Sequence, residues 1–359
     1  MAINVTKSFL PPFEEYQEAI KGIWENTWLT NNGPLVRKLE EELKAYLGIE
    51  NLLFVGNGTI ALQIAVKAMG LTGEIITTPF SYCATTTAIL WENLQPVFVD
   101  IEPKTFNINA DLIEDAITEK TSAIIATHVY GRPCEIEKIE NIAQKYKLKV
   151  IYDGAHAFGA TYKGKSVLSF GDVSTCSFHA TKVFHTIEGG SVTCNDNELL
   201  KKLELYRSFG HKGDDYFSMG INAKNSEFHA AMGLCNLPKV ADIIEHRKAI
   251  SEKYDSLLNW QKLVRPTQKI ADFVYNYAYY PVVFESEDKL HEVTNALIKE
   301  EITPRRYFYP SLNQLPYLDF YHSCPVSENY ASSALSLPLY YDLALNDVEH
   351  ISAIINQNL

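Results

Sequence analysis

The sequence predicts an α/β fold in which helices cover a mostly parallel central sheet, followed by a smaller C-terminal α+β domain. Short β-rich runs alternate with helical patterns up to about residue 245, as in parallel sheets. Runs such as SAIIATHV and KVIYD are apolar on both faces, as expected of strands with helices on both sides. Beyond residue 245 the alternation ends, so we expect a large domain at 1–245 and a small one at 246–359.

Each β-rich run of the large domain predicts one strand: Leu52–Val55, Ile75–Thr77, Val97–Asp100, Ala123–Thr127, Val150–Tyr152, Thr175–Phe178 and Ser191–Cys194. The patterns between them predict helices at Thr59–Met69, Ser81–Glu92, Glu135–Lys145 and Asn197–Phe209. The first of these helices follows a Gly-Asn-Gly turn and stops at Gly70, so both of its ends carry boundary signals.

In the small domain, Lys239–Leu258 predicts a long connecting helix and Tyr277–Phe284 predicts a strand. An amphipathic helix is expected over Ser286–Glu301, because apolar residues recur there at helical spacing: Leu290, Val293, Leu297 and Ile298. The segment Ala331–Leu339 and a final helix complete the chain.

The composition bounds the function. The 359 residues are 46% hydrophobic and carry a formal net charge of −12, which is ordinary for a globular protein and unfavourable for nonspecific binding to nucleic acid or a membrane surface. The six cysteines form no C-x-x-C pair, so we expect no metal site and a reducing compartment. The N-terminus does not resemble a signal peptide, and no apolar run reaches the ~18 residues of a membrane span. We therefore expect a cytoplasmic protein that binds neither nucleic acid nor membrane.

The segment TCSFHATKVFHTIEGG (Thr175–Gly190) places Lys182 shortly after a predicted strand. A single lysine is usually a surface residue. Here Phe178, Val183 and Phe184 would partly desolvate the amine, lower its pKa and make it a nucleophile toward aldehydes.

The segment VIYDGAHAFGA places Asp153 at the C-terminal end of a strand, where open α/β sheets bind ligands. An aspartate there can pair with a protonated pyridine nitrogen, and His156 lies within reach of the same place. Alternatively, Asp153 caps the next turn and His156 packs against it.

Two further segments complete the pattern. In FVGNGTIAL, the small residues around Gly58, Thr59 and Ile60 let backbone N–H groups bind an anion at a helix start, although the segment is neither a P-loop nor G-x-G-x-x-G. In TTPFSYCATTT, Tyr82 either stacks on a planar ligand or belongs to the core. Together the segments offer an amine, an acid, an anion site and an aromatic face, all of which pyridoxal 5′-phosphate requires.

The sequence resembles the DegT/DnrJ/EryC1/StrS family of sugar aminotransferases, which share the aspartate-aminotransferase-like architecture, fold type I of the pyridoxal phosphate enzymes. Besides NGT, D-x-A-H-A and SFHATK…EGG, the matching motifs are TWLTNNGP (Thr27–Pro34), GINAKNSEFHAAMG (Gly220–Gly233), TPRRYFYP (Thr303–Pro310) and SLPLYYDL (Ser336–Leu343). The resemblance therefore extends over nearly the whole chain.

The resemblance implies a role for each matching residue. Lys182 would bind pyridoxal phosphate covalently and shuttle a proton, Asp153 would pair with the ring nitrogen, and His156 would lie beside the ring. Tyr82 would stack on the ring. The phosphate would be held by Gly58, Thr59, the Ile60 backbone and Ser177. Asn222 would reach the phosphate of a neighbouring subunit, which implies a homodimer with shared sites.

The expected substrate-binding residues are Lys224, Arg305, Arg306 and Tyr307. The family's usual N-x-R-M reads N-A-K-N in this chain. Lys224 thus lacks the planar fork with which an arginine grips a phosphate or carboxylate.

The implied reaction transfers an amino group from L-glutamate to a nucleotide-linked (dTDP) 4-keto-6-deoxyhexose, giving a 4-amino-4,6-dideoxy sugar for surface glycans such as the O-antigen of lipopolysaccharide. The same chemistry on a 3-keto-6-deoxy or UDP-linked sugar remains an alternative. A dehydratase of the family would carry histidine in place of Lys182. A pyridoxal-phosphate-binding sensor or regulatory protein is the non-enzymatic alternative, and an unliganded α/β domain would leave the four features unexplained.

Overall fold

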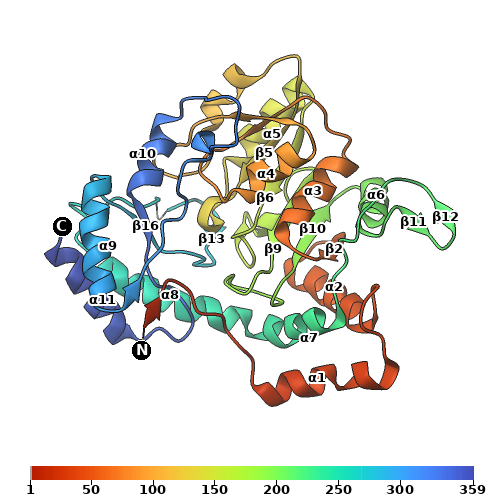
Figure 1. The fold of residues 1–359 in the computed structure, drawn as a ribbon, viewed down its shortest axis with the longest axis horizontal. Coiled ribbons are helices and arrows are strands. Elements are labelled where there is room, and N and C mark those ends of the chain that lie inside the picture. Colours follow the sequence, from red (N-terminus) through yellow and green to blue (C-terminus); the bar gives the residue numbers. More distant parts are fainter. Residues whose placement is uncertain (1, 268) are drawn as a thin grey trace.

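The computed structural model describes residues 2–267 and 269–359 and is built around a central sheet (Figure 1). The seven strands follow the order β2-β10-β9-β6-β5-β3-β4. Only β10 runs antiparallel to its neighbours, so the expectation of a mostly parallel sheet is confirmed. The strands are β2 (Leu52–Val55), β3 (Glu74–Thr77), β4 (Gln95–Phe98), β5 (Thr121–Thr127), β6 (Lys149–Asp153), β9 (Val173–Ser177) and β10 (Gly190–Cys194).

Helices cover both faces of this sheet. On β6, Ile151 packs in one apolar cluster with residues of α3 and α6, whereas Val150 and Tyr152 pack in another with residues of α5. This alternation follows the two-residue period of a strand. The helices of this region are α1 (Phe13–Asn26), α2 (Pro34–Leu47), α3 (Gly58–Ala68), α4 (Ala84–Trp91), α5 (Ile136–Tyr146), α6 (Asn197–Arg207) and α7 (Glu227–Asn236).

The C-terminal part has its own apolar cluster, formed around helices α8 (Val240–Leu257), α9 (Glu287–Lys299) and α11 (Leu345–Gln357). It also contains α10 (Pro325–Ser333) and the antiparallel pair β14 (Pro281–Val283) and β16 (Ala334–Ser336). The N-terminal strand β1 (Ile3–Asn4) pairs with β15 (Ile302–Thr303), so the first residues join this part. The expected boundary at residue 245 falls inside α8, and the division into two domains stays a prediction.

Short elements complete the described residues. Strands β7 (Thr161–Tyr162), β8 (Lys165–Ser166) and β13 (Phe273–Val274) form a small sheet. Strands β11 (His211–Lys212) and β12 (Asp215–Tyr216) form a hairpin that projects on the side opposite α9 and α11 (Figure 1). No helix within the described ranges is long and apolar enough to cross a membrane.

Two predicted boundaries differ from the structure near the site. Helix α4 begins at Ala84 rather than Ser81, which leaves Ser81 and Tyr82 in the preceding loop. The strand predicted at Tyr277–Phe284 is confined to β14, because Tyr277 has a φ of 51° and interrupts the extended backbone.

Candidate active site

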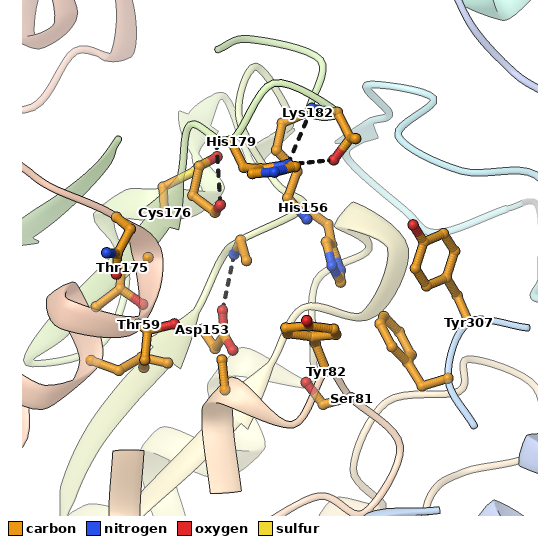
Figure 2. A pocket seen from close by; sticks show the side chains of 18 of the residues that line it. Thr59, Ser81, Tyr82, Asp153, His156, Thr175, Cys176, His179, Lys182 and Tyr307 are labelled. Carbon is orange, nitrogen blue, oxygen red and sulfur yellow. Dashed lines mark hydrogen bonds between the residues drawn. The ribbon is translucent and has the colours of Figure 1, made fainter. Parts of the chain in front are cut away.

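A cavity of about 240 Å³ lies where β6, β9 and the start of α3 meet. In Figure 2, the side chains of Asp153 and His156, from β6 and the loop after it, reach the same space as those of Lys182 and Tyr82. Most of the predicted site residues line this cavity: Gly58, Thr59, Tyr82, Asp153, His156, Ser177, Lys182, Arg305 and Tyr307. Since strand ends are where α/β sheets bind ligands, the location agrees with the sequence-based expectation.

The structure places the other predicted residues outside this cavity. The backbone N–H of Ile60 donates to Oδ1 of Asn57, the N-cap of α3, at 2.8 Å. Arg306 forms an ion pair with Glu287 at 2.7 Å and also donates to a backbone carbonyl of α10. Asn222 is exposed just beyond the β11–β12 hairpin. The ammonium group of Lys224 lies 4.9 Å from the centre of the Phe209 ring.

Asp153 terminates β6 and is held by two hydrogen bonds. The hydroxyl of Thr85 donates to Oδ2 at 2.6 Å, and the N–H of Ala155 donates to Oδ1 at 3.0 Å. Burial raises the pKa of Asp153 above its ordinary value, although both hydrogen bonds and the charge of Lys182 act in the opposite direction. Sequence reasoning missed Thr85, even though it lies in the segment that contains Tyr82.

Lys182 is half-buried, and its Nζ donates to the hydroxyl of Tyr279 at 3.2 Å. Burial by itself lowers the pKa of this amine, but Tyr279, Asp153 and Tyr307 outweigh it, so the pKa is raised. The predicted lowering of the Lys182 pKa was therefore wrong, because it considered apolar neighbours and omitted the polar ones. Tyr279 was also missed, since its segment was interpreted as part of a strand.

His156 forms one buried wall of the cavity. Its ring stacks on Phe308 with centres 5.5 Å apart and meets the edge of Tyr279 at 5.0 Å. Burial and the charge of Lys182 lower its pKa well below the ordinary value, so the ring is neutral. Its Nδ1 is buried and has no hydrogen-bond partner among residues 2–267 and 269–359. A ligand group that hydrogen-bonds to this nitrogen, as donor or acceptor according to the ring tautomer, would satisfy it.

The start of α3 can hold an anion. Asn57 caps Ile60, whereas the N–H groups of Gly58 and Thr59 have no acceptor within the described part of the chain. A Cβ atom on Gly58 would lie 3.0 Å from Cβ of Ser177, so a larger residue would require Ser177 to shift and glycine favours this close approach of α3 to β9. Free N–H groups at the positive end of a helix favour a phosphate.

This geometry fits pyridoxal phosphate. Gly58, Thr59 and Ser177 would hold its phosphate, Asp153 would face its ring nitrogen, and Lys182 would reach its aldehyde carbon. The exposed side of Tyr82, which is 54% accessible, offers a ring face toward the same cavity.

Comparison with known proteins gives the same result. The model of the DegT/DnrJ/EryC1/StrS aminotransferase family matches residues 13–356. The chain is 42% identical to a dTDP-4-amino-4,6-dideoxy-D-glucose transaminase of Shigella dysenteriae, over 99% of this chain and 98% of that protein. Among solved structures, it is similar to DesI in the presence of its TDP-sugar product, with a TM-score of 0.93 and 30% identity over 99% of this chain and 92% of DesI.

The pyridoxal phosphate form of Spr1654 from Streptococcus pneumoniae is also similar. Its TM-score is 0.90 at 26% identity, and the match covers 99% of this chain and all of that chain. These matches confirm the expected fold type I architecture and cofactor. The chain therefore belongs to the DegT/DnrJ/EryC1/StrS aminotransferase family, whose members use pyridoxal phosphate.

Proposed function

We propose that the protein transfers the amino group of L-glutamate to the keto carbon of a dTDP-linked 4-keto-6-deoxyhexose, giving a dTDP-4-amino-4,6-dideoxy sugar. The observation that supports an aminotransferase reaction is that Lys182, Asp153 and the start of α3 line the same cavity. The similarity to the Shigella transaminase supports the choice of sugar.

Lys182, Asp153 and His156 would each have a different role in the reaction. When bound, pyridoxal phosphate supplies an electron sink for the carbon that loses its proton. Nζ of Lys182, which reaches the cavity, would be the base that takes the proton from the α-carbon of the amino donor and the acid that later returns it. Asp153, whose carboxylate is buried at the end of β6, would hold the ring nitrogen in its protonated form. The neutral ring of His156 closes the site without adding charge.

Arg305 is the residue we assign to an anionic part of the substrate. It lines the cavity, and its guanidinium carbon lies 4.8 Å from the centre of the Tyr307 ring. No carboxylate within the described ranges forms an ion pair with it. Arg305 is therefore available for a diphosphate or a donor carboxylate. Arg306, paired with Glu287, is not.

We also propose a homodimer in which Asn222 completes the site of the partner subunit. Asn222 is exposed and does not line the cavity of its own chain. The neighbouring surface is apolar and exposed at Tyr216, Phe217, Met219 and Ile221. Such a patch on a projecting hairpin is typical of a surface that another chain covers. Lys224 would reach the partner's substrate from the same segment.

The cellular setting is also part of the proposal. All six cysteines are free, which suits a reducing compartment, and we place the enzyme in the cytoplasm. Its product would then serve the synthesis of a surface glycan such as the O-antigen of lipopolysaccharide.

The test is the absorbance spectrum of the purified protein with pyridoxal phosphate. A band near ~420 nm should move toward ~330 nm on addition of L-glutamate and return on addition of dTDP-4-keto-6-deoxyglucose. Mass spectrometry and NMR would then identify the amino sugar. A band that glutamate does not move would contradict the donor. A return only with a 3-keto or UDP-linked sugar would contradict the acceptor.

A further inference from the structure

The hydroxyl of Tyr279 is the hydrogen-bond partner of Lys182. Its oxygen lies 3.2 Å from Nζ, and no other group in the described residues forms a hydrogen bond with that amine. The Tyr279 ring is 8% exposed and lies between two other site rings, with centres 5.0 Å from His156 and 5.3 Å from Tyr307. The hydroxyl is therefore held in a packed environment beside the amine.

The segment that carries Tyr279 is anchored on several sides. Asn276 donates to the carbonyl of His156 at 2.7 Å, which joins the segment to the loop after β6. Tyr275 donates to the carbonyl of Tyr279 itself at 3.1 Å. From α8, Arg247 donates to the two carbonyls in between, those of residues 277 and 278, at 2.8 and 2.6 Å. The position of the Tyr279 hydroxyl is thus set by the backbone around it rather than by Lys182.

Arg247 makes this anchoring unusual. The side chain is 5% exposed and forms no ion pair within the described part of the chain, and burial lowers its pKa to about 10. An unpaired buried guanidinium is costly, so its hydrogen bonds to these carbonyls are strong and hard to replace. These hydrogen bonds fix the backbone directly before Tyr279.

We propose that Tyr279 is a positioning residue that keeps the ε-amine of Lys182 at one place in the cavity through its changes of protonation state. This inference rests on the proposed function, in which Lys182 accepts and returns a proton. A phenolic hydroxyl both accepts and donates hydrogen bonds. It accepts from Nζ while the amine is charged and donates to Nζ once the amine is neutral.

The groups that face Lys182 come from several elements. From β6 and the loop after it come Asp153 and His156, from β9 comes Cys176, and from the C-terminal part come Tyr279 and Tyr307. Of these, Tyr279 opposes the effect of burial on the Lys182 pKa most strongly, followed by Asp153. Removal of the Tyr279 hydroxyl should therefore lower the pKa of Lys182.

The test uses Tyr279→Phe in the full-length protein freed of cofactor. Reductive methylation of Lys182, followed over pH by peptide mass spectrometry, reports the titration of its amine. We expect the midpoint to move to lower pH by about one unit, the size of a hydrogen bond to a charged group. In the loaded enzyme, kcat should fall about tenfold with little change in the KM for glutamate.

Tyr330→Phe is the matched control. It also removes one tyrosine hydroxyl hydrogen-bonded at 3.2 Å, here to the carbonyl of Pro103 outside the cavity. Its midpoint should equal that of the wild type. Tyr279→Leu provides a second variant without the hydroxyl if the phenylalanine variant does not fold. A wild-type midpoint in a folded variant lacking this hydroxyl would overturn the inference. The labelling needs no sugar substrate, so failure of the proposed reaction would be detected separately.

Discussion

Thr85 donates its hydroxyl hydrogen to Oδ2 of Asp153 at 2.6 Å and so joins the first turn of α4 to the end of β6. Behind it, Ser81 lies 3.0 Å from the Thr85 hydroxyl, and Thr127 donates to Ser81 over the same distance. All three hydroxyls are buried. Because each hydroxyl can donate toward the carboxylate, the chain stabilises the ionised form of Asp153 against the cost of burial.

Replacing Thr85 by valine should therefore raise the pKa of Asp153. The reaction needs the ionised carboxylate, so the acidic limb of the kcat–pH profile should move to higher pH. On the acidic limb we expect kcat at a given pH to fall by up to about tenfold, as for loss of a hydrogen bond to a charged group. Thr85→Ser keeps the hydroxyl and should retain the wild-type profile. Identical acidic limbs in both variants would show that Thr85 does not act on Asp153.

Asp153→Ala should lower kcat strongly and change the free energy of unfolding only slightly. The carboxylate acts on the cofactor during the reaction, so kcat should fall by at least ~10²-fold. The free energy of unfolding should change by no more than ~2 kcal/mol, because burial of the charge already opposes its stabilising hydrogen bonds. Urea unfolding and steady-state kinetics on the same preparation separate the two effects. A large loss of stability with normal turnover would contradict the assignment.

Lys182→Ala should lose both turnover and the cofactor band near ~420 nm while remaining folded.

The same variant also tests whether the site is shared between subunits. If Asn222 acts in the partner's site, mixing Lys182→Ala with Asn222→Ala subunits creates one intact site in each mixed dimer. Activity should then reappear after the two inactive proteins are unfolded and refolded together. No recovery in verified mixed dimers would place Asn222 in the site of its own chain.

The site was predictable to the extent that its residues are adjacent to strand ends. Asp153 is the last residue of β6, and Gly58 and Lys182 lie three and five residues after the ends of β2 and β9, so the local sequence indicates their placement. Thr85 and Tyr279 were missed because they contact Asp153 and Lys182 from 68 and 97 residues away. No local pattern marks a hydroxyl as the partner of a distant charge. The direction of the Lys182 pKa was wrong for the same reason.

Helices α1, α2, α7 and α10 were not predicted, and α2 shows why. Its first turn is capped by Glu227 of α7, whose carboxylate accepts from the N–H groups of Leu35 and Val36 at 2.8 and 2.9 Å. The residue before the helix, Gly33, makes no side-chain cap. The start signal is therefore supplied through tertiary contact, about 190 residues away in sequence.

Glu227→Ala should destabilise the protein by about 2–3 kcal/mol. It leaves two N–H groups at a buried helix start without acceptors and removes a negative charge from the positive end of α2. Glu227→Gln retains one acceptor and should lose less. Unfolding in urea would measure both values. Because Glu227 lies outside the cavity, kcat per folded molecule should be unchanged in the glutamine variant, and a tenfold lower kcat would assign it a role in the site instead.

His128 makes the stability of the cofactor-free protein depend on pH. Its ring is fully buried and stacked on Tyr152 at 4.5 Å, its Nδ1 accepts from the N–H of Cys134, and burial lowers its pKa to about 3. The unfolded chain binds a proton at this residue below about pH 6.5, whereas the folded chain does not. Stability due to His128 is therefore present above pH 6.5 and is lost as the pH falls toward 3.

His128→Asn isolates this effect, since its side-chain oxygen can accept from Cys134 but does not titrate. Between pH 6 and 4, the free energy of unfolding of the wild type should fall more steeply than that of the variant, by about 1.4 kcal/mol per pH unit. Urea unfolding at several pH values gives both slopes, and other titrating groups cancel in the difference. Parallel slopes would mean that His128 binds its proton equally in both states, which a buried imidazole without a partner for Nε2 within the described residues should not do.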